Sequence, residues 1–546
     1  MINCRYLRSG LFAIALALTA GCRESEPAKP LPSLPATPAD ASRETPYALR
    51  LHWIGRERLS AESNATNFMA IWNMPESLRL QNQTLDKLST APSRFLLGQT
   101  NATNTASTLL RPLLEHIVDH ESYLEIHRST NGPFALALAV RLDAEKARLW
   151  ESNLPAAMKS LAAVTSVAQS NLQQWALNTR DGIKSVQFTR TGDWVVFGLT
   201  ASDNGLFNVL QQRLEQNGSL PSELSSGHWL KTEFDLNCLL QPAGFNWKIG
   251  GDPAVRMIVT GGGENVRTHA EVKFNRPLNL RFEPWTLPTN MVIEPLSSFT
   301  AVRGVDSWLS NLRIWKDLKV GPPPNQWYVW SSPGIPAQVF LAAPHADASN
   351  TVRQASDYLA RTVNPLLKPG DWGEFEALPE TVGAHWVRLP FAAPFVKAFS
   401  GDGNAWIVGG SFLPAESASP MPLGLMQAIS ADTNVFYYDW EITGSKIQTD
   451  LYWVQMLRLV SDKSQIADES ASGAWLMAMR ANLGNAVTQA GQEGPLGLAI
   501  TRSSVVGFTS LELQVLADWL ESPDFPSGLH TFVATNPPPA TPAGGN

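Results

Sequence analysis

Two histidines spaced four residues apart are the clearest candidates for chemistry in this sequence. His116 and His120 lie in residues 107–120, whose apolar periodicity predicts a helix with both imidazoles on one face. Two imidazoles at this spacing can bind zinc, and Asp119 stands where the inverted zinc-peptidase motif has its general-base glutamate. However, the leucines of this segment form the buried stripe, and no third ligand is identifiable. We therefore predict that both histidines face solvent and hold no metal.

Four acidic residues near the middle of the chain are the second candidate. A glycoside hydrolase needs two carboxyl groups about 5 to 9 Å apart. Spacing in the sequence does not set that separation, and a solvated acidic loop is the preferred interpretation. The chain also has no Gly-x-Ser-x-Gly, Ser-x-x-Lys, phosphate-binding lysine loop, paired Cys-x-x-Cys or EF-hand motif, so we assign no catalytic residue and no cofactor. The four acids are Asp371, Glu374, Glu376 and Glu380.

The N-terminal segment carries a different chemistry. Residues 1–21 contain two arginines and then an uncharged run that is shorter than the about 20 apolar residues of a membrane-spanning helix. The run ends in Leu-Thr-Ala-Gly-Cys at residues 18–22, which resembles a lipobox, where bacteria attach lipid to a cysteine and cleave before it. A lipobox usually has leucine where this chain has Thr19; the alternative is an ordinary signal peptide with a chance cysteine. We predict that Cys22 is lipidated and that the protein is exported and held at a bilayer, on the periplasmic or outer-membrane face.

Composition excludes one class of partner. Without residues 1–21 the chain has 40 Lys and Arg against 49 Asp and Glu, so no basic surface for nucleic acid is expected. Only Cys22 and Cys238 then remain, which leaves no disulfide framework, and Cys238 is expected to be a buried thiol among leucines. The 19 tryptophans could line a sugar-binding groove, but a large core is the preferred explanation.

The two ends of the chain have no core-forming composition. Residues 22–46 are rich in proline and read as an extended tether, and residues 535–546 read as a disordered tail of Pro, Ala, Gly and Thr.

Strands and helices alternate irregularly between these ends. Two short turns join strand-like runs into hairpins, at residues 191–193 and 261–263, without a regular helix between strands. This pattern predicts an α+β fold with an antiparallel or mixed sheet. Strands are expected at residues 49–54, 121–128, 134–142, 186–190, 194–200, 256–260 and 269–274, and helices at residues 75–88, 107–120, 144–150, 449–460, 474–487 and 510–520, the third capped by Asp143 and the last by a Thr509–Glu512 capping box.

The second half of the chain repeats the first. The strand and the Asp-capped helix of residues 135–150 match residues 337–360, where Asp347 opens the helix. The hairpins that contain Trp194 and Trp406 match, as do Phe-Asp-Leu at 234–236 and Tyr-Asp-Trp at 438–440. The same order and similar spacing predict two related modules, residues 47–285 and 286–530, with each tryptophan packed against its Asp-capped helix. Chance similarity among strands is the alternative.

Residues 51–55 (Leu-His-Trp-Ile-Gly) and 71–77 (Ile-Trp-Asn-Met-Pro-Glu-Ser), with the helix capped by Asp143 and the Gly-Asp-Trp hairpin at 192–194, resemble large exported bacterial lipoproteins of an uncharacterised domain family. The resemblance implies an α+β fold and carries no catalytic residue.

Three function classes are consistent with the sequence. The preferred one is a non-enzymatic envelope protein that binds or scaffolds a protein or polysaccharide partner, attached to the lipid bilayer through Cys22. The alternatives are an exported hydrolase directed at glycosides or peptides, and a carrier of an apolar ligand. A hydrolase needs a cleft with convergent groups, and a carrier needs an apolar cavity.

Overall fold

The structure is a computed structural model of the chain. The predicted signal peptide, Cys22, the predicted tether and the predicted tail lie outside the residues that it describes. Those residues are 47–98, 105–127, 135–169, 172–180, 182–200, 205–217, 227–240, 250–278, 280–292, 295–333, 338–367, 373–389, 392–401, 403–413, 421–460, 470–523 and 525–526.

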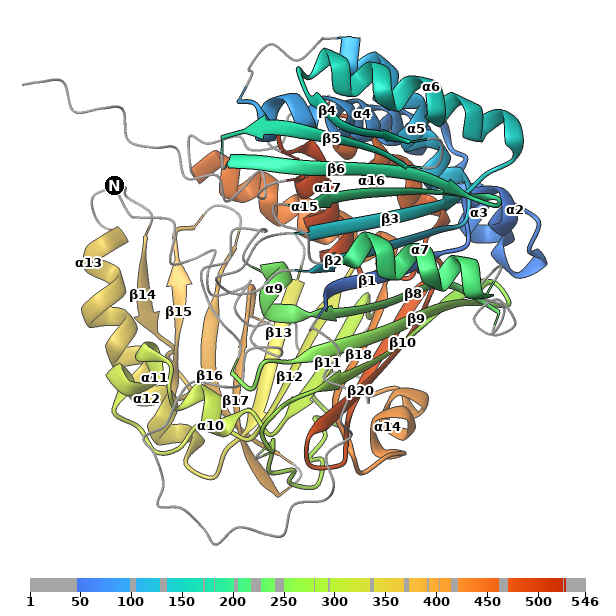
Figure 1. Cartoon of the computed structure of the whole chain (residues 1–546). Coiled ribbons are helices and arrows are strands. Elements are labelled where there is room, and N and C mark those ends of the chain that lie inside the picture. The colour runs from blue at the N-terminus through green and yellow to red at the C-terminus, as the bar shows by residue number, and fades with distance from the viewer. Residues whose placement is uncertain are drawn as a thin grey trace, which may run out of the picture.

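Within the described residues, twenty strands form one continuous sheet, and every pairing between neighbours is antiparallel (Figure 1). With its helices the fold is α+β, as predicted. In spatial order the first half contains β4 (Val164–Gln169), β5 (Leu172–Thr179), β6 (Gly182–Thr191), β7 (Trp194–Thr200), β3 (Ala135–Arg141), β2 (Ser122–His127), β1 (Tyr47–Trp53), β8 (His228–Asp235), β9 (Ala254–Gly262) and β10 (Asn265–Lys273). From the opposite edge, the second half contains β14 (Glu374–Ala377), β15 (Gly383–Val387), β16 (Phe395–Gly401), β17 (Asn404–Gly410), β13 (Gln338–Pro344), β12 (Gln326–Ser332), β11 (Ser298–Arg303), β18 (Val435–Ile442), β19 (Asn485–Glu493) and β20 (Gly497–Ser504).

The strand order shows the duplication directly. β11 to β20 occupy the second half in the same order as β1 to β10 occupy the first, and the two halves join edge to edge through β10 and β20. The predicted module boundary after residue 285, at the start of a Pro-rich stretch, lies in the connection between β10 and β11. The two related modules predicted from the sequence are therefore present as two halves of one sheet.

The matched tryptophans occupy equivalent hairpins. Trp194 in β7 faces Arg141, the last residue of β3, and Trp406 in β17 faces Pro344, the last residue of β13. Their side chains are fully buried, so they belong to the core, as expected for a Trp-rich α+β protein. The prediction of equivalent hairpins is confirmed.

The third sequence match is out of register. The paired residues can be followed from Trp194 through β3 and β2 to β1, and from Trp406 through β13 and β12 to β11. This makes Leu51 in β1 equivalent to Thr300 in β11. Leu51 faces Thr232, whereas Thr300 faces Asp439. Asp439 is therefore equivalent to Thr232 and not to Asp235, so this match was wrong by three residues although it lies in equivalent strands.

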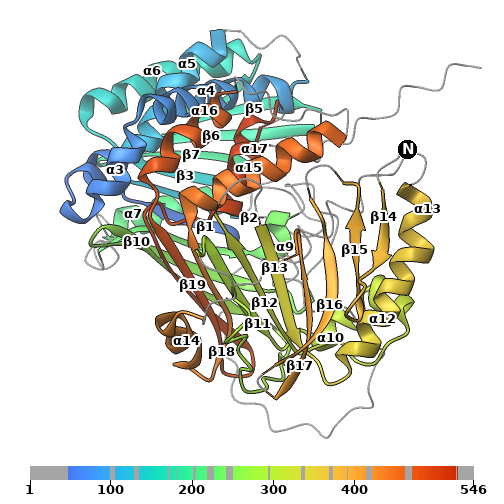
Figure 2. The same cartoon turned by 180° about the vertical axis from the view of Figure 1, so that it is seen from behind.

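Helices cover the two faces of the sheet differently. We call the side that carries α7 (Leu206–Asn217) and α14 (Leu423–Ser430) the front face, and the opposite side the back face (Figures 1 and 2). On the back face, a row of helices in which each contacts the next spans both modules. α12 (Ala348–Tyr358) packs on the same face at the end of the second module. In contact order the row is α6 (Ala144–Ser160), α5 (Thr105–Asp119), α4 (Pro75–Ala91), α16 (Ala471–Met479), α17 (Ser510–Glu521) and α15 (Thr443–Val460).

Each tryptophan packs on the front face with a tyrosine. The Trp194 ring lies 5.5 Å from Tyr123, and the Trp406 ring lies 6.2 Å from Tyr328, with Tyr123 and Tyr328 at equivalent places in β2 and β12. Trp194 shares its core with leucines of α7, and Trp406 shares its core with Ile429 of α14. The expectation that they pack against the Asp-capped helices was wrong, because α6 and α12 lie on the back face.

Local signals explain most helix boundaries. Asp143 accepts from the backbone amides of Glu145 and Lys146 at the start of α6, and Thr509 and Glu512 form the predicted capping box of α17. Asp347 occupies the N-cap position of α12 without a side-chain cap bond. The helix expected over residues 474–487 was wrong in its second part, because α16 ends at Met479 and residues 485–487 begin β19.

Six shorter α-helices are described besides the 3-10 and π helices at residues 63–65, 92–96, 359–363 and 480–482. They are α2 (Arg56–Ser60), α3 (Thr66–Trp72), α9 (Leu236–Leu240), α10 (Asp306–Leu309), α11 (Arg313–Leu318) and α13 (Asn364–Leu367). Among the helices in the described residues, none combines the length and the apolar character needed to cross a bilayer.

Gly55 and Gly304 follow equivalent strands and both have positive φ, 91° and 75°. A Cβ atom on Gly55 would lie 2.6 Å from the Asp119 carbonyl oxygen, whereas one on Gly304 would lie 3.2 Å from the Phe282 side chain and 3.4 Å from the Arg281 carbonyl oxygen. We predict that Gly55→Ala lowers the free energy of unfolding by about 2 kcal/mol and Gly304→Ala by about 1 kcal/mol. Urea denaturation followed by circular dichroism measures both, and equal losses would contradict this account.

Candidate functional site

The histidine pair is not on a solvated face. The His120 side chain is 11% exposed, and its Nδ1 lies 3.3 Å from Glu57 Oε2, while the indole Nε1 of Trp150 donates to His116 Nδ1 at 3.2 Å. Burial, followed for His116 by the nearby His120, lowers the pKa of both imidazoles. The expectation that both face solvent was therefore wrong. Among the described residues, no group of three or more His, Cys, Asp or Glu side chains is placed to hold a metal ion.

The other candidates from the sequence do not come together into a site. Asp371 lies outside the described residues; Glu374 on β14 forms an ion pair with Arg388 at 2.6 Å, and Glu376 and Glu380 are exposed near this edge of the sheet. Cys238, expected in the core, is half-buried in α9.

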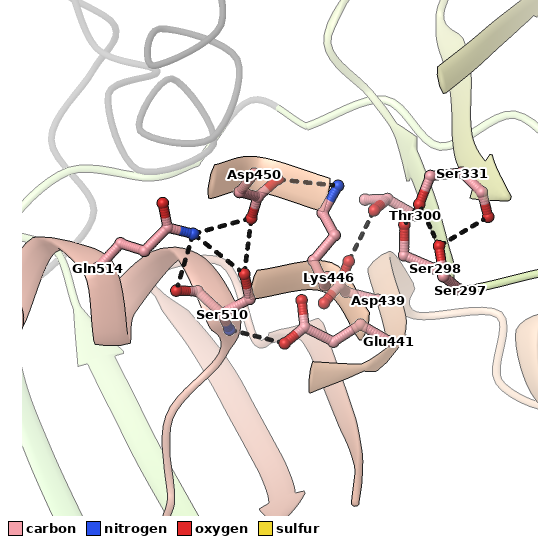
Figure 3. Close-up of polar contacts among 10 residues, drawn as sticks. All are labelled: Ser297, Ser298, Thr300, Ser331, Asp439, Glu441, Lys446, Asp450, Ser510 and Gln514. Atoms are coloured by element: carbon pink, nitrogen blue, oxygen red, sulfur yellow. Dashed lines mark hydrogen bonds and ion pairs between the residues drawn. The ribbon is translucent and has the colours of Figure 1, made fainter. Parts of the chain in front are cut away.

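A buried charge cluster that the sequence analysis missed lies between the sheet and the helix row (Figure 3). Asp439 and Glu441 project from β18 on the back face, and only 9% and 4% of these residues is exposed. Thr300 Oγ1 donates to Asp439 at 2.6 Å, and the Ser510 amide at the start of α17 donates to Glu441 at 2.7 Å. Lys446 on α15 lies 3.7 Å from Asp450. The cluster thus joins β11, β18, α15 and α17.

The acids of this cluster outnumber its cations. Arg502 on β20 pairs with Glu512 on α17, and Lys446 pairs with Asp450, so Asp439 and Glu441 have no cation of their own within the described cluster. Burial raises the pKa of Asp439, and burial together with the charge of Asp439 raises the pKa of Glu441 to about 8. Burial opposes the charge of Lys446, but the surrounding carboxylates outweigh it and raise the pKa of this amine.

The described contacts of the cluster join its own residues to one another, and they hold α17 against the sheet and α15. Ser510 Oγ and Gln514 Nε2 both donate to Asp450 Oδ2, at 2.6 and 2.9 Å (Figure 3). A signal was present in the sequence, because residues 435–442 place acids at alternate positions of an otherwise apolar strand. That pattern predicts paired acids on one face of the strand, although it does not give their partners.

A second buried polar group ties the first module together. His52 Nδ1 lies 2.9 Å from His228 Nε2, and His52 Nε2 lies 3.0 Å from Glu121 Oε1. All three side chains are less than a tenth exposed, and the Tyr123 ring stacks on His52 at 4.2 Å. The described contacts of this carboxylate–imidazole–imidazole chain hold β1, β8 and the start of β2 together.

A small hollow of about 220 Å³ lies beside Glu121. Most of its charged groups are paired: Glu121 lies 3.5 Å from Arg141, and His120 lies 3.3 Å from Glu57, whereas the exposed Arg58 has no described ion pair. Apart from Arg58, the hollow therefore offers little uncompensated charge to a ligand.

A larger groove of about 450 Å³ lies on the front face where the two modules meet. The strand register places eight of its ten lining residues in two rows that cross β9, β10, β20 and β19; the other two are Thr268 and Arg502. One row contains Thr260, Arg267, Ser503 and Val487, and the other contains Ile258, His269, Thr501 and Gln489.

The groove lies on the axis that relates the modules. The equivalence of the two modules can be followed from β8 to β9 in the first and from β18 to β19 in the second. The paired residues then make Ile258 equivalent to Gln489 and His269 equivalent to Thr501. His269 and Thr501 also face each other across the β10–β20 pair. The pseudo-twofold axis therefore passes between these two residues, and each module contributes one wall of the groove.

No protein-family model and no curated protein sequence matches the chain. Three solved structures give weak likenesses, all of them crystal forms of TP0453. Form III has 8% identity over 44% of this chain and 79% of that chain with a TM-score of 0.25, and form IV has 7% identity over 42% and 77% with a TM-score of 0.24. Likeness at this level gives no basis for transferring a fold or a function.

Proposed function

We propose that this protein is a lipid-anchored, exported envelope protein that binds an extended polysaccharide in the groove between its two modules. The observation that carries the proposal is the position of the groove on the pseudo-twofold axis, where both modules supply its walls. Duplication then serves binding directly, because the second copy completes the surface that a single module would leave half-formed.

The polar groups of the lining suit a hydrated chain, whose sugar rings can also contact the carbon atoms that make up most of the groove's surface. Hydroxyl, amide, guanidinium and imidazole groups line the groove, and the only aliphatic side chains there are those of Ile258 and Val487. Protein interfaces are usually centred on aromatic or large apolar residues, and carriers of apolar ligands enclose an apolar cavity. Sugar hydroxyls, by contrast, need many donors and acceptors over an open surface.

The same lining gives less support to the hydrolase alternative. None of its ten residues is a carboxylate, and Ser503 Oγ accepts from the Asn265 amide at 3.2 Å instead of contacting His269. The groove therefore lacks both a carboxyl pair and a serine–histidine pair among its lining residues.

Blocking the groove tests the proposal. Thr501 is exposed at its centre, so Thr501→Trp fills it without disturbing the core. The unaltered protein is first screened by affinity electrophoresis against purified peptidoglycan fragments, dextran and polygalacturonate. We expect that any of these polysaccharides that retards the unaltered protein will no longer retard the Thr501→Trp variant. Asn178→Trp, at an exposed position of β5 remote from the groove, is the matched control and keeps retention. The proposal fails if none of the polysaccharides retards the protein, or if both variants bind equally.

The membrane attachment is tested separately. The lipobox-like residues 18–22 and the Pro-rich residues that follow support lipid on Cys22. We predict that Cys22→Ala moves the protein from the membrane fraction into the soluble fraction after export. Persistent co-sedimentation of the alanine variant with washed membranes would show that another feature holds the protein there.

A further inference from the structure

The charge of the groove is opposite to that of the protein as a whole. The chain has a net charge of −7, yet none of the ten groove residues is acidic, and Arg267 contributes a permanent positive charge. The nearest acid along the His269 strand is Glu271, which lies 3.8 Å from His269 and 3.9 Å from Lys273. The row that contains Arg267 crosses the four strands without a carboxylate.

Arg267 differs from other arginines of the sheet. Arg50 and Arg141 on the first module and Arg502 on the second each pair with a glutamate. Arg267 is exposed, and its guanidinium makes no hydrogen bond or ion pair with any described residue. An arginine left unpaired in a hollow without carboxylates is placed to bind an anion from outside.

The neighbouring strand leaves room for this side chain. A Cβ atom on Gly262 of β9 would lie 2.2 Å from Arg267 Nε. The Arg267 side chain therefore lies over β9 at Gly262, in the space that any other residue's side chain would fill. A guanidinium presents its donors in a planar fork that matches the two oxygens of a carboxylate. Thr260, Ser503 and Thr501 lie beside it and can bind hydroxyl groups.

We infer that the groove selects an acidic polysaccharide, one whose sugars carry carboxylates, and that Arg267 binds the carboxylate while the threonine and serine hydroxyls contact the sugar. This inference rests on the proposed function and narrows it to one substrate class. Because a guanidinium–carboxylate contact is charge-assisted, binding also weakens as salt is raised.

Polygalacturonate and its methyl ester form a matched pair of probes, since esterification removes the charge and keeps the chain. We expect the protein to bind polygalacturonate at least about tenfold more tightly than the ester, and Arg267→Gln to abolish this preference. Arg256→Gln is the control, because Arg256 lies on the same face of β9 outside the groove, 3.6 Å from Glu233. We expect Arg256→Gln to keep the preference for polygalacturonate over its methyl ester.

The outcomes separate the inference from the proposed function. If the ester binds as tightly as the acid and Thr501→Trp blocks both, the groove binds polysaccharide but the acidic selectivity is wrong. If poly-glutamate competes as well as polygalacturonate, the groove binds anions without recognising sugar, and the inference also fails. If neither polygalacturonate nor any neutral polysaccharide binds, the proposed function itself is wrong.

Discussion

Arg303→Met is expected to lower the free energy of unfolding by about 3–5 kcal/mol. Arg303 ends β11 and is 3% exposed. Its guanidinium donates to the carbonyls of Val435, Thr433 and Glu283, and so connects the start of β18 to the connection between the modules. It also lies 4.5 Å from the Trp285 ring. Methionine fills part of the volume but leaves these carbonyls without their donors.

The control for this prediction is Arg267→Met, at an exposed arginine without a described partner, which should change stability by less than about 0.5 kcal/mol. Arg303→Lys keeps the charge but cannot reach three carbonyls, so it should recover only part of the loss. Urea denaturation followed by tryptophan fluorescence measures all three variants. An Arg303→Met protein as stable as the unaltered one would show that the connection between the modules is held by other contacts.

The second large effect is a pH dependence of stability from Glu441. Its pKa is raised from 4.5 to about 8 in the folded protein, so folding favours the protonated acid. The stability that this group contributes is therefore fully present below about pH 4.5 and is lost as the pH rises through about 8. The loss is on the order of 5 kcal/mol, at about 1.4 kcal/mol for each pKa unit. The raised pKa of Asp439 acts in the same direction.

Glu441→Gln isolates this contribution. Glutamine keeps an oxygen that accepts from the Ser510 amide and cannot ionise, so the variant should gain stability relative to the unaltered protein as the pH rises from 5 to 8. Glu376→Gln, on an exposed strand position, should leave the profile unchanged. Parallel profiles for Glu441→Gln and the unaltered protein would mean that Glu441 is already ionised in the folded state.

The duplicated fold could be predicted because local signals repeat in order. The turns before Trp194 and Trp406 and the acids Asp143 and Asp347 lie at similar spacings, and each depends on a few neighbouring residues. The third match failed because a strand's register is set by its neighbours in the sheet, which similarity of short motifs does not show.

The histidine pair shows a different limit. A helical wheel assumes one buried face, but α5 contacts α4, α6 and α2, so His116 and His120 are covered although they lie away from the leucine stripe. Tertiary packing overrides the pattern at these positions.

The groove could not be found from the sequence at all. Its two walls come from β9 and β10 and from β19 and β20, and they meet only because His269 in the first module pairs with Thr501 in the second. β10, for example, shows only the ordinary alternation of polar and apolar residues that a half-buried strand has. Nothing in that alternation indicates which distant strand will be its neighbour.

Hydroxyl-radical footprinting of the full-length protein tests most directly whether the groove between the modules is the binding site. With saturating polygalacturonate, we predict that oxidation falls in the peptides that contain Ile258, His269 and Val487, and that exposed Ile183 on β6 is unchanged. Retention of the polysaccharide without protection of these three residues, or with protection centred on Ile183, would contradict the account.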